Sequence, residues 1–293
     1  MSRSLLRIDD LSRDDAYALI DRARALQHGA APAVTPFVAS LLFLSSSLRT
    51  RSGFSAATYR LGGRVIDVFE PRFDATMSSA ESVEDTLETL AGISDVLVVR
   101  GPLDLGVATT HLGDSVPVMC AGDNDHHPTQ ALIDWFAIAE LVGPPAGLRI
   151  ALVGDLTMRA SRSFLDLAAL LGVTGLALVP APGRLPDPEF SSGHAVIEPS
   201  ELGDFAPDVV SMIGLPPRRG DRELSTAERA PYILDERLAA TLPATCTVLS
   251  PMPVIDEIAP ETRRNPRVRM FEQNALAVAV RMAALEFVLQ PTG

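Results

Sequence analysis

The sequence alternates short apolar runs with longer amphipathic segments, and this alternation is compatible with only a few folds. Runs such as 37–44 ("FVASLLFL") and 95–101 ("DVLVVRG") are typical of buried strands. Segments 12–27 and 49–63 are typical of helices; the first begins with Ser12 and acidic residues, and the second ends at a Gly pair. Strands that alternate with helices form parallel sheets with helices on both faces, so we expect an α/β fold of doubly wound parallel sheets.

The same rhythm runs through both halves of the 293-residue chain. The Pro/Gly-rich stretch "PPAGLR" at 144–149 interrupts it, which predicts a domain boundary. The other predicted strands are 64–70, 116–123, 149–156, 175–182, 208–214 and 245–253, and the other predicted helices are 81–94, 127–143, 159–172 and 274–289. Segments 183–199 and 214–232 are polar and rich in Pro, which fits either functional lids or plain surface loops.

Charge and composition exclude several classes of function. The net charge is −12, which is unfavourable for binding nucleic acid or an anionic membrane surface. No run reaches the ~18 apolar residues of a membrane span. All 25 residues in the Lys+Arg count are arginine, so no lysine can form a Schiff base or act as a general base.

The two cysteines, Cys120 and Cys246, are far apart and lie in apolar contexts. They fit buried thiols in a reducing cytoplasm; a nucleophilic role for Cys120 is the alternative. The first residues carry acids early and have no long apolar run, which argues against a signal peptide and again favours a cytoplasmic protein.

The stretch "SSSLRTRSGF" at 45–54 follows a predicted buried strand and begins a predicted helix. Backbone N–H groups point outward at a helix start and, together with the helix dipole, favour an anion there. Ser47 and Thr50 add hydroxyl donors, and the planar guanidinium of Arg49 matches two phosphate oxygens. A simple capped helix with solvated arginines explains this stretch alone equally well.

Other polar residues occupy equivalent strand-to-helix junctions. Arg100 ends the predicted strand 95–101, and His127 and Gln130 begin the predicted helix 127–143, three residues apart and therefore on one face. In a parallel sheet such junctions gather at the carboxyl ends of the strands, where ligands bind. The pattern predicts one crevice lined with donors for an anion and for a carbonyl oxygen.

With these motifs in place, the sequence resembles the aspartate/ornithine carbamoyltransferase family. The family signature Ser-Thr-Arg-Thr-Arg corresponds to Ser47-Leu48-Arg49-Thr50-Arg51, and His-Pro-x-Gln to 127–130. The likeness runs over nearly the whole chain, and the sequence around 116–134 looks most like the aspartate branch. The resemblance implies a carbamoyl-phosphate domain (1–143), an acceptor domain (144–274) and a C-terminal helix (275–293) that packs back on the first domain.

The resemblance also implies the chemistry. Members of the family transfer the carbamoyl group of carbamoyl phosphate to an amine, without metal or organic cofactor, and commonly form homotrimers with active sites at subunit interfaces. The residues implied to act in catalysis are Arg49, Thr50, Arg100, His127 and Gln130. Those implied to bind carbamoyl phosphate are the same five with Ser47, Leu48 and Met252. The residues implied to bind the acceptor are Arg159, Pro251 and Met252, with Arg218, Arg219 or Arg222 as substitutes for a missing arginine.

Departures from the family pattern concentrate where the amine would bind. Ser78 and Ser79 stand where the aspartate branch has lysines, and the nearby Arg72 is poorly placed to replace them. Gly214 stands in place of an acceptor-binding arginine, and Pro216 in place of a glutamine. His-Pro-Leu-Pro becomes 250–253 ("SPMP"), with a cis proline expected; the His-Cys-Leu-Pro motif of the ornithine branch is absent.

Two functions remain open from the sequence. The first is a carbamoyltransferase whose acceptor is not simply aspartate, in a specialised biosynthetic pathway. The second is a non-catalytic homologue that binds carbamoyl phosphate or a partner subunit. The complete set at 47–50, 100, 127 and 130 favours catalysis, because a site without turnover has no physical need for all of these residues.

Overall fold

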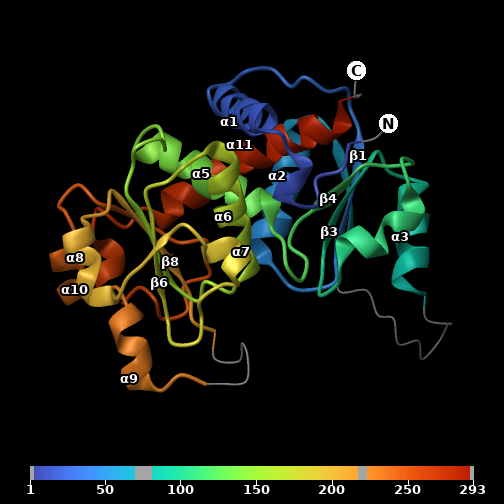
Figure 1. Ribbon diagram of the computed structural model, residues 1–293. Coiled ribbons are helices and arrows are strands. Elements are labelled where there is room, and N and C mark those ends of the chain that lie inside the picture. Colours follow the sequence, from blue (N-terminus) through green and yellow to red (C-terminus); the bar gives the residue numbers. More distant parts are fainter. Residues whose placement is uncertain (1–2, 70–80, 217–222, 291–293) are drawn as a thin grey trace. The chain divides into compact units, whose positions relative to one another are not determined.

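A computed structural model describes residues 3–69, 81–216 and 223–290 (Figure 1). It confirms an α/β fold with two parallel sheets. The chain divides into two compact units, residues 1–132 with 276–293, and residues 133–275. Helices α5 (Pro128–Leu141) and α11 (Met270–Leu289) each contribute residues to both units.

The first unit contains a sheet with the strand order β2-β1-β3-β4, all parallel. Its strands are β1 (Val38–Phe43), β2 (Arg64–Phe69), β3 (Val96–Arg100) and β4 (Val118–Cys120). Its helices include α1 (Arg13–Gln27), α2 (Leu48–Arg60), α3 (Val83–Ala91), the short α4 (Leu105–Ala108) and the end of α11. The 3₁₀ turns are η1 (Ile8–Asp10) and η2 (Thr110–Leu112). The chain runs from β1 outward to β2 and then returns to β3 on the other side, so the switch point lies between β1 and β3.

Local sequence explains the elements that border this switch point. β1 is buried from Ala39 to Phe43, as its apolar run predicts. Helix α2 starts directly afterwards with Ser47 as the N-cap residue in an extended conformation. Helix α1 begins with a capping box, in which Ser12 accepts a hydrogen bond from the backbone of Asp15 and the Asp15 side chain accepts one in return. Both predicted helices are confirmed, with Ser12 and Ser47 as their N-cap residues.

The end of α11 packs against the first unit through polar and aromatic contacts. Glu286 accepts hydrogen bonds from Arg22 Nη2 (2.9 Å) on α1 and from the backbone N–H of Ala33 (2.7 Å). The guanidinium of Arg3 lies 3.7 Å from the ring centre of Phe287. These contacts attach the last turns of the chain to elements near its beginning.

The second unit contains a sheet with the strand order β7-β6-β5-β8-β9, again all parallel. Its strands are β5 (Ile150–Gly154), β6 (Leu176–Pro180), β7 (Ala195–Val196), β8 (Val209–Ile213) and β9 (Thr247–Leu249). Its helices are α6 (Arg159–Leu171), α7 (Pro188–Ser191), α8 (Leu202–Phe205), α9 (Thr226–Arg229) and α10 (Glu236–Thr241). The 3₁₀ turns are η3 (Pro199–Glu201), η4 (Ala230–Tyr232) and η5 (Thr262–Arg264). The switch point of this sheet lies between β5 and β8.

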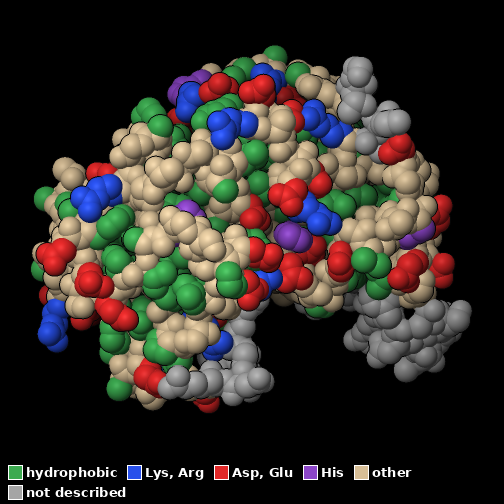
Figure 2. All heavy atoms as spheres, in the orientation of Figure 1, with side chains coloured by type: hydrophobic (Ala, Val, Ile, Leu, Met, Phe, Trp, Pro, Cys, Tyr) green, Lys and Arg blue, Asp and Glu red, His purple; other side chains and the backbone are tan. Residues whose placement is uncertain are grey.

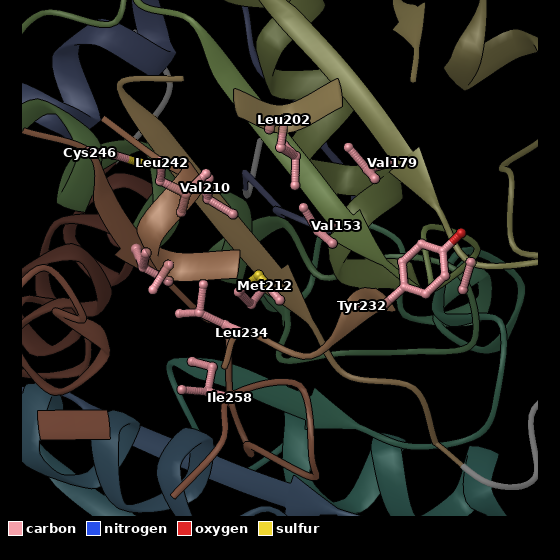
Figure 3. Close-up of a cluster of buried hydrophobic side chains, with 14 of the residues drawn as sticks. Val153, Val179, Leu202, Val210, Met212, Tyr232, Leu234, Leu242, Cys246 and Ile258 are labelled. Carbon is pink, nitrogen blue, oxygen red and sulfur yellow. The ribbon is translucent and has the colours of Figure 1, made fainter. Parts of the chain in front are cut away.

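The core of the second unit packs on the sheet. Val153, Val179, Val210 and Met212 project from the three strands β5, β6 and β8 toward residues of the connecting segments, and Tyr232 lies at one end of the cluster (Figure 3). The thiol of Cys246 is buried in the same cluster, and burial raises its pKa to about 12. Cys120 is also buried, so the predicted pair of buried thiols is confirmed.

The structure corrects the prediction of two long loops, because segment 214–232 contains α9 and η4. Segment 183–199 is not a continuous loop, because it contains α7 and the strand β7, which pairs in parallel with β6. Two residues, Ala195 and Val196, are too short a run to show the alternation by which strands are predicted.

On the face shown in Figure 2, basic side chains are interspersed with acidic ones.

Candidate active site

The carboxyl ends of β1 and β3 form the floor of the candidate site in the first unit. Phe43 pairs with Arg100 in the sheet register, and the N–H of Leu44 donates to the Arg100 carbonyl at 2.8 Å. The segment 45–50 and the Arg100 side chain therefore leave the sheet next to each other. This is the switch point of the first sheet, the place where doubly wound folds bind their ligands.

The start of α2 provides the donors for an anion. The first bond within the helix runs from Arg51 N–H to the Ser47 carbonyl at 3.1 Å, so the N–H groups of residues 48–50 have no partner inside the helix. The hydroxyl of Ser47 donates to Thr50 Oγ1 at 3.0 Å, which holds both hydroxyls at the helix start. Leu48 is 80% exposed, so its side chain is not part of this arrangement and only its backbone N–H contributes.

The two arginines of this stretch have different roles. Arg51 forms a bidentate ion pair with Asp67 on β2, and its guanidinium lies 4.3 Å from the ring centre of Phe69. Arg49 makes no hydrogen bond or ion pair with any other described residue, and burial lowers its pKa. Arg49 is therefore the one of the pair that can accept an anion.

Arg100 and His127 bring donors from two neighbouring strands together. Arg100 Nη1 donates to the Ala121 carbonyl at 2.8 Å and lies 3.4 Å from His127 Nε2. His127 Nδ1 lies 3.4 Å from the Thr129 hydroxyl. The two 3.4 Å contacts are long for hydrogen bonds, so an oxygen atom placed beside both Arg100 and His127 would receive a donor from each. Gln130 follows on the first turn of α5, where its N–H donates to the His127 carbonyl at 2.9 Å.

The residues expected to bind the acceptor border the switch point of the second sheet. β5 ends at Gly154, where an added Cβ would lie 2.0 Å from the Ile213 carbonyl oxygen, so only glycine allows the ends of β5 and β8 to approach this closely. Arg159 is the first residue of α6, which follows β5, and Gly214 directly follows β8. Arg159 and Gly214 therefore follow the two strands that flank this switch point.

An acidic group, not a basic one, lies beside Gly214. An added Cβ there would lie 3.1 Å from Glu257 Oε2. Glu257 is 1% exposed and accepts hydrogen bonds from the backbone N–H groups of Ile255 (2.8 Å) and Asp256 (3.2 Å). Burial raises the pKa of the Glu257 carboxyl in spite of these bonds. Arg229, the next described arginine of this segment, is bound to Asp256 (2.9 Å) and to the Leu215 carbonyl (2.6 Å).

The turn at 250–253 is held by its own polar contacts. The peptide bond from Met252 to Pro253 is cis, as expected from the sequence. Met252 adopts a φ of 54°, and its N–H donates to Ser250 Oγ at 3.0 Å. Its side chain packs partly against the core cluster of the second unit, and Pro251 beside it is partly buried.

Six residues singled out from the sequence lie outside the described residues: Arg72, Ser78, Ser79, Arg218, Arg219 and Arg222. Sequence reasoning missed Arg281, whose side chain is almost fully buried beside α2. The signal was present, because an arginine interrupts the apolar stretch "ALAVAVRMAALEFVL". Within the described ranges there is no group of three or more His, Cys, Asp and Glu residues placed to hold a metal ion. None of the helices described has the length and hydropathy that a membrane span requires.

Comparison with known proteins gives consistent matches along the chain. Residues 3–140 match the family model described as "Aspartate/ornithine carbamoyltransferase, carbamoyl-P binding domain". The aspartate carbamoyltransferase catalytic subunit of Bifidobacterium adolescentis is 31% identical over 298 residues, covering 97% of this chain and 92% of that protein. The corresponding subunit of Thermofilum pendens is 32% identical over 304 residues, covering 98% and 95%.

Solved structures show the same likeness. The aspartate transcarbamoylase of Trypanosoma cruzi in complex with carbamoyl phosphate aligns with a TM-score of 0.82 at 28% identity, covering 97% of this chain and 95% of that chain. The same enzyme in complex with carbamoyl phosphate and aspartate aligns with a TM-score of 0.81 at 28% identity.

Proposed function

The chain belongs to the aspartate/ornithine carbamoyltransferase family, a family of transferases, and we propose that it moves the carbamoyl group of carbamoyl phosphate to an amine. The observation that carries this proposal is the pairing of two donor groups at one switch point. The start of α2, with Arg49, offers an anion site, and Arg100 and His127 lie 3.4 Å apart at the adjacent strand ends.

The proposed reaction uses these groups in sequence. The unprotonated amine attacks the carbonyl carbon, a C–N bond forms, and the C–O bond to the phosphate breaks. Negative charge develops on the carbonyl oxygen, where Thr50, Arg100 and His127 point donors. A single fixed donor of this kind is worth ~3 kcal/mol. The phosphate leaves toward Ser47, Leu48 N–H, Arg49 and Thr50, and it takes up the proton that the amine loses. Gln130 orients the carbamoyl amide, and holding both reactants together removes much of the entropic barrier.

We further propose that the acceptor differs from aspartate, and that a specialised pathway uses the product. Two arginines would suit an acceptor with two carboxylates; Arg159 is present, but Gly214 supplies no cation. The carboxyl of Glu257 lies over Gly214 instead, and Arg229 is engaged with Asp256. Losing one cation opposite a buried carboxylate costs several kcal/mol of affinity. Pro251 and Met252 complete the proposed acceptor region, and Met252 also borders the carbamoyl group.

We also propose a cytoplasmic homotrimer that needs no cofactor. A hollow of about 510 Å³ lies between α2 and β2, lined by Ser46, Ser47, Leu48, Arg51, Ser52, Ser55, Ala56, Tyr59, Asp67 and Phe69. Leu48, Tyr59 and Phe69 are 80%, 62% and 39% exposed. Apolar side chains gathered at a hollow fit a surface that a second copy covers. The two buried thiols fit a reducing compartment.

A non-catalytic homologue that binds carbamoyl phosphate or a partner subunit is the alternative function. The observation in its favour is the absence of a cation at Gly214, next to Glu257. Turnover with any amine decides against it.

The test is the release of phosphate and the formation of a ureido product from carbamoyl phosphate by the purified protein. The amines are L-aspartate, L-ornithine and a panel that includes 2,3-diaminopropionate. Arg49→Ala should abolish most of the activity found, whereas Arg60→Ala, an exposed arginine at the other end of α2, should leave it unchanged. Undiminished activity in Arg49→Ala would refute the proposed phosphate site. No turnover, with carbamoyl phosphate still raising the Tm, would favour the non-catalytic homologue.

A further inference from the structure

Arg281 is a buried cation in the middle of helix α11, within its apolar stretch 275–285. It is 3% exposed, and its Nε atom is buried without a hydrogen-bond partner. No hydrogen bond or ion pair joins it to any of the residues that the structure describes. An unpaired buried charge is strongly unfavourable, so a counter-charge is to be expected from something other than the residues that the structure describes.

The guanidinium of Arg281 lies directly against the second turn of α2. A Cβ added to Gly53 would lie 2.1 Å from Arg281 Nη1 and 2.7 Å from its Cζ. The guanidinium carbon lies 5.4 Å from the ring centre of Phe54, a distance at which a cation–π contact gives partial compensation. Glycine inside a helix is less favourable than alanine. The space that Gly53 leaves for Arg281 is the structural reason for a glycine there.

Helix geometry places this second cation beneath Arg49. Gly53 is four residues after Arg49, so the two lie on the same face of α2, one turn apart. The pKa of Arg281 falls to about 10, because of burial first and the nearby charge of Arg49 second. Both side chains stay charged at neutral pH. The first turns of α2 thus combine outward N–H groups with two like charges that no described residue neutralises.

We propose that Arg281 is a positioning residue of the phosphate site, which reaches α2 through the gap at Gly53 and makes the site selective for a doubly charged anion. This inference rests on the proposed function, in which the phosphate of carbamoyl phosphate binds at the start of α2. Arg281 acts on the phosphate through its field and through the position of Arg49. A dianion relieves the repulsion between the two guanidinium groups, and a monoanion of the same shape relieves less of it.

The test uses the full-length protein and two variants that disturb Arg281 differently. Arg281→Met keeps about the same side-chain volume and removes the charge. Gly53→Ala keeps the charge, but its new methyl group forces the Arg281 guanidinium away from α2. The probe is inorganic phosphate, measured by titration calorimetry, with steady-state kinetics on carbamoyl phosphate. We expect phosphate affinity to fall about tenfold or more in both variants, with a rise in KM for carbamoyl phosphate and a smaller change in kcat. Arg281→Lys should restore part of the affinity.

The stability of the phosphate-free protein separates this role from a purely structural one. Removing an unpaired buried charge should raise the Tm of Arg281→Met by a few degrees, whereas loss of a structural contact would lower it. Arg60→Met, which removes an exposed charge from the same helix, should change neither the Tm nor the phosphate affinity. A lower Tm with unchanged phosphate affinity in Arg281→Met would overturn the inference.

The failure of this inference differs from the failure of the proposed function. If Arg49→Ala abolishes phosphate binding and both Arg281→Met and Gly53→Ala bind phosphate like the wild type, the inference is wrong and the proposed phosphate site remains. If the wild type binds neither phosphate nor carbamoyl phosphate, both are wrong.

Discussion

Arg100 Nη1 and His127 Nε2 lie 3.4 Å apart, although 27 residues separate them in the chain. They meet because β3 and β4 are parallel neighbours: Arg100 is the last residue of β3, and His127 lies in the segment that leads from β4 to α5. Their side chains converge on one point, where each can donate to the same oxygen. This pair makes the site suitable for a reaction that builds charge on a carbonyl oxygen.

Replacing His127 tests that role directly. His127→Ala should lower kcat about 10²- to 10³-fold, because it removes one fixed donor from the transition state, and should change phosphate affinity much less. The measurement is steady-state kinetics with the amine that supports turnover, together with phosphate titration. His111→Ala, which removes an exposed histidine of the same unit, serves as the control. A kcat within twofold of the wild type would show that His127 does not stabilise the oxyanion.

The attachment of α11 to α1 should contribute strongly to stability. Glu286→Ala removes a carboxylate that is 2% exposed; Arg22 then keeps its bond to the Ala31 carbonyl, and the Ala33 N–H loses its partner. We expect a loss of about 3 kcal/mol in the free energy of unfolding, measured by urea denaturation. Glu272→Ala on the same helix breaks an exposed pair with Arg269 and should cost less than about 1 kcal/mol. Equal losses in the free energy of unfolding of the two variants would contradict the expectation that the buried carboxylate contributes more than the exposed one.

Glu257 should make stability depend on pH in a predictable direction. Burial raises the pKa of its carboxyl above the usual 4.5, so the folded protein holds the proton more tightly than the unfolded chain. Its contribution is therefore complete below about pH 4.5 and is lost as the pH rises through the folded pKa.

Glu257→Gln cannot ionise and avoids this loss. The Tm of the variant minus that of the wild type should increase from pH 4.5 upward, in thermal melts across the acidic and neutral range. Glu261→Gln, an exposed neighbour, should show a flat difference. A difference for Glu257→Gln that falls with pH would mean that the folded protein favours the ionised carboxylate.

The hollow beside α2 predicts the oligomeric state. Tyr59→Glu places a charge on the apolar surface that we propose a second copy covers, so the mass by light scattering should fall from that of three 31.2 kDa chains toward that of one. Tyr17→Glu, at an exposed tyrosine of α1, should leave the assembly unchanged. A wild type that runs as a monomer at micromolar concentration would refute the homotrimer.

Much of the fold could be predicted because its signals are local. Ser12 and Ser47 mark helix starts, the run before Ser45 forms a buried strand, and the turn at 250–253 contains the expected cis peptide bond. The proximity of Arg100 and His127 could also be predicted from the sequence, because parallel strands place their carboxyl ends on one edge of the sheet. Each of these steps needs only a pattern of residues and a rule of backbone geometry.

Other features depend on packing between distant segments. Arg281 and Gly53 are 228 positions apart, and nothing in either local sequence shows that the guanidinium fills the gap left by the glycine. The carboxyl of Glu257 over Gly214 is a similar case: the sequence showed the loss of an arginine, and only the fold showed what lies there. The two-residue strand β7 was missed because its sheet neighbour, not its own pattern, determines it.

Restoring the missing cation tests the proposed change of acceptor. Gly214→Arg places a guanidinium at the end of β8, beside Glu257, whose Oε2 would lie 3.1 Å from the new Cβ. If the acceptor site has lost affinity for a dicarboxylate, kcat/KM for L-aspartate should rise about tenfold or more, as expected for one regained charge pair. Gly203→Arg, on the short helix α8 of the same unit, controls for added positive charge and should have no effect on aspartate turnover. The measurement is ureido-product formation at fixed carbamoyl phosphate. A wild type that already uses aspartate as efficiently as the variant would show that other residues grip its carboxylates, and that the acceptor is aspartate after all.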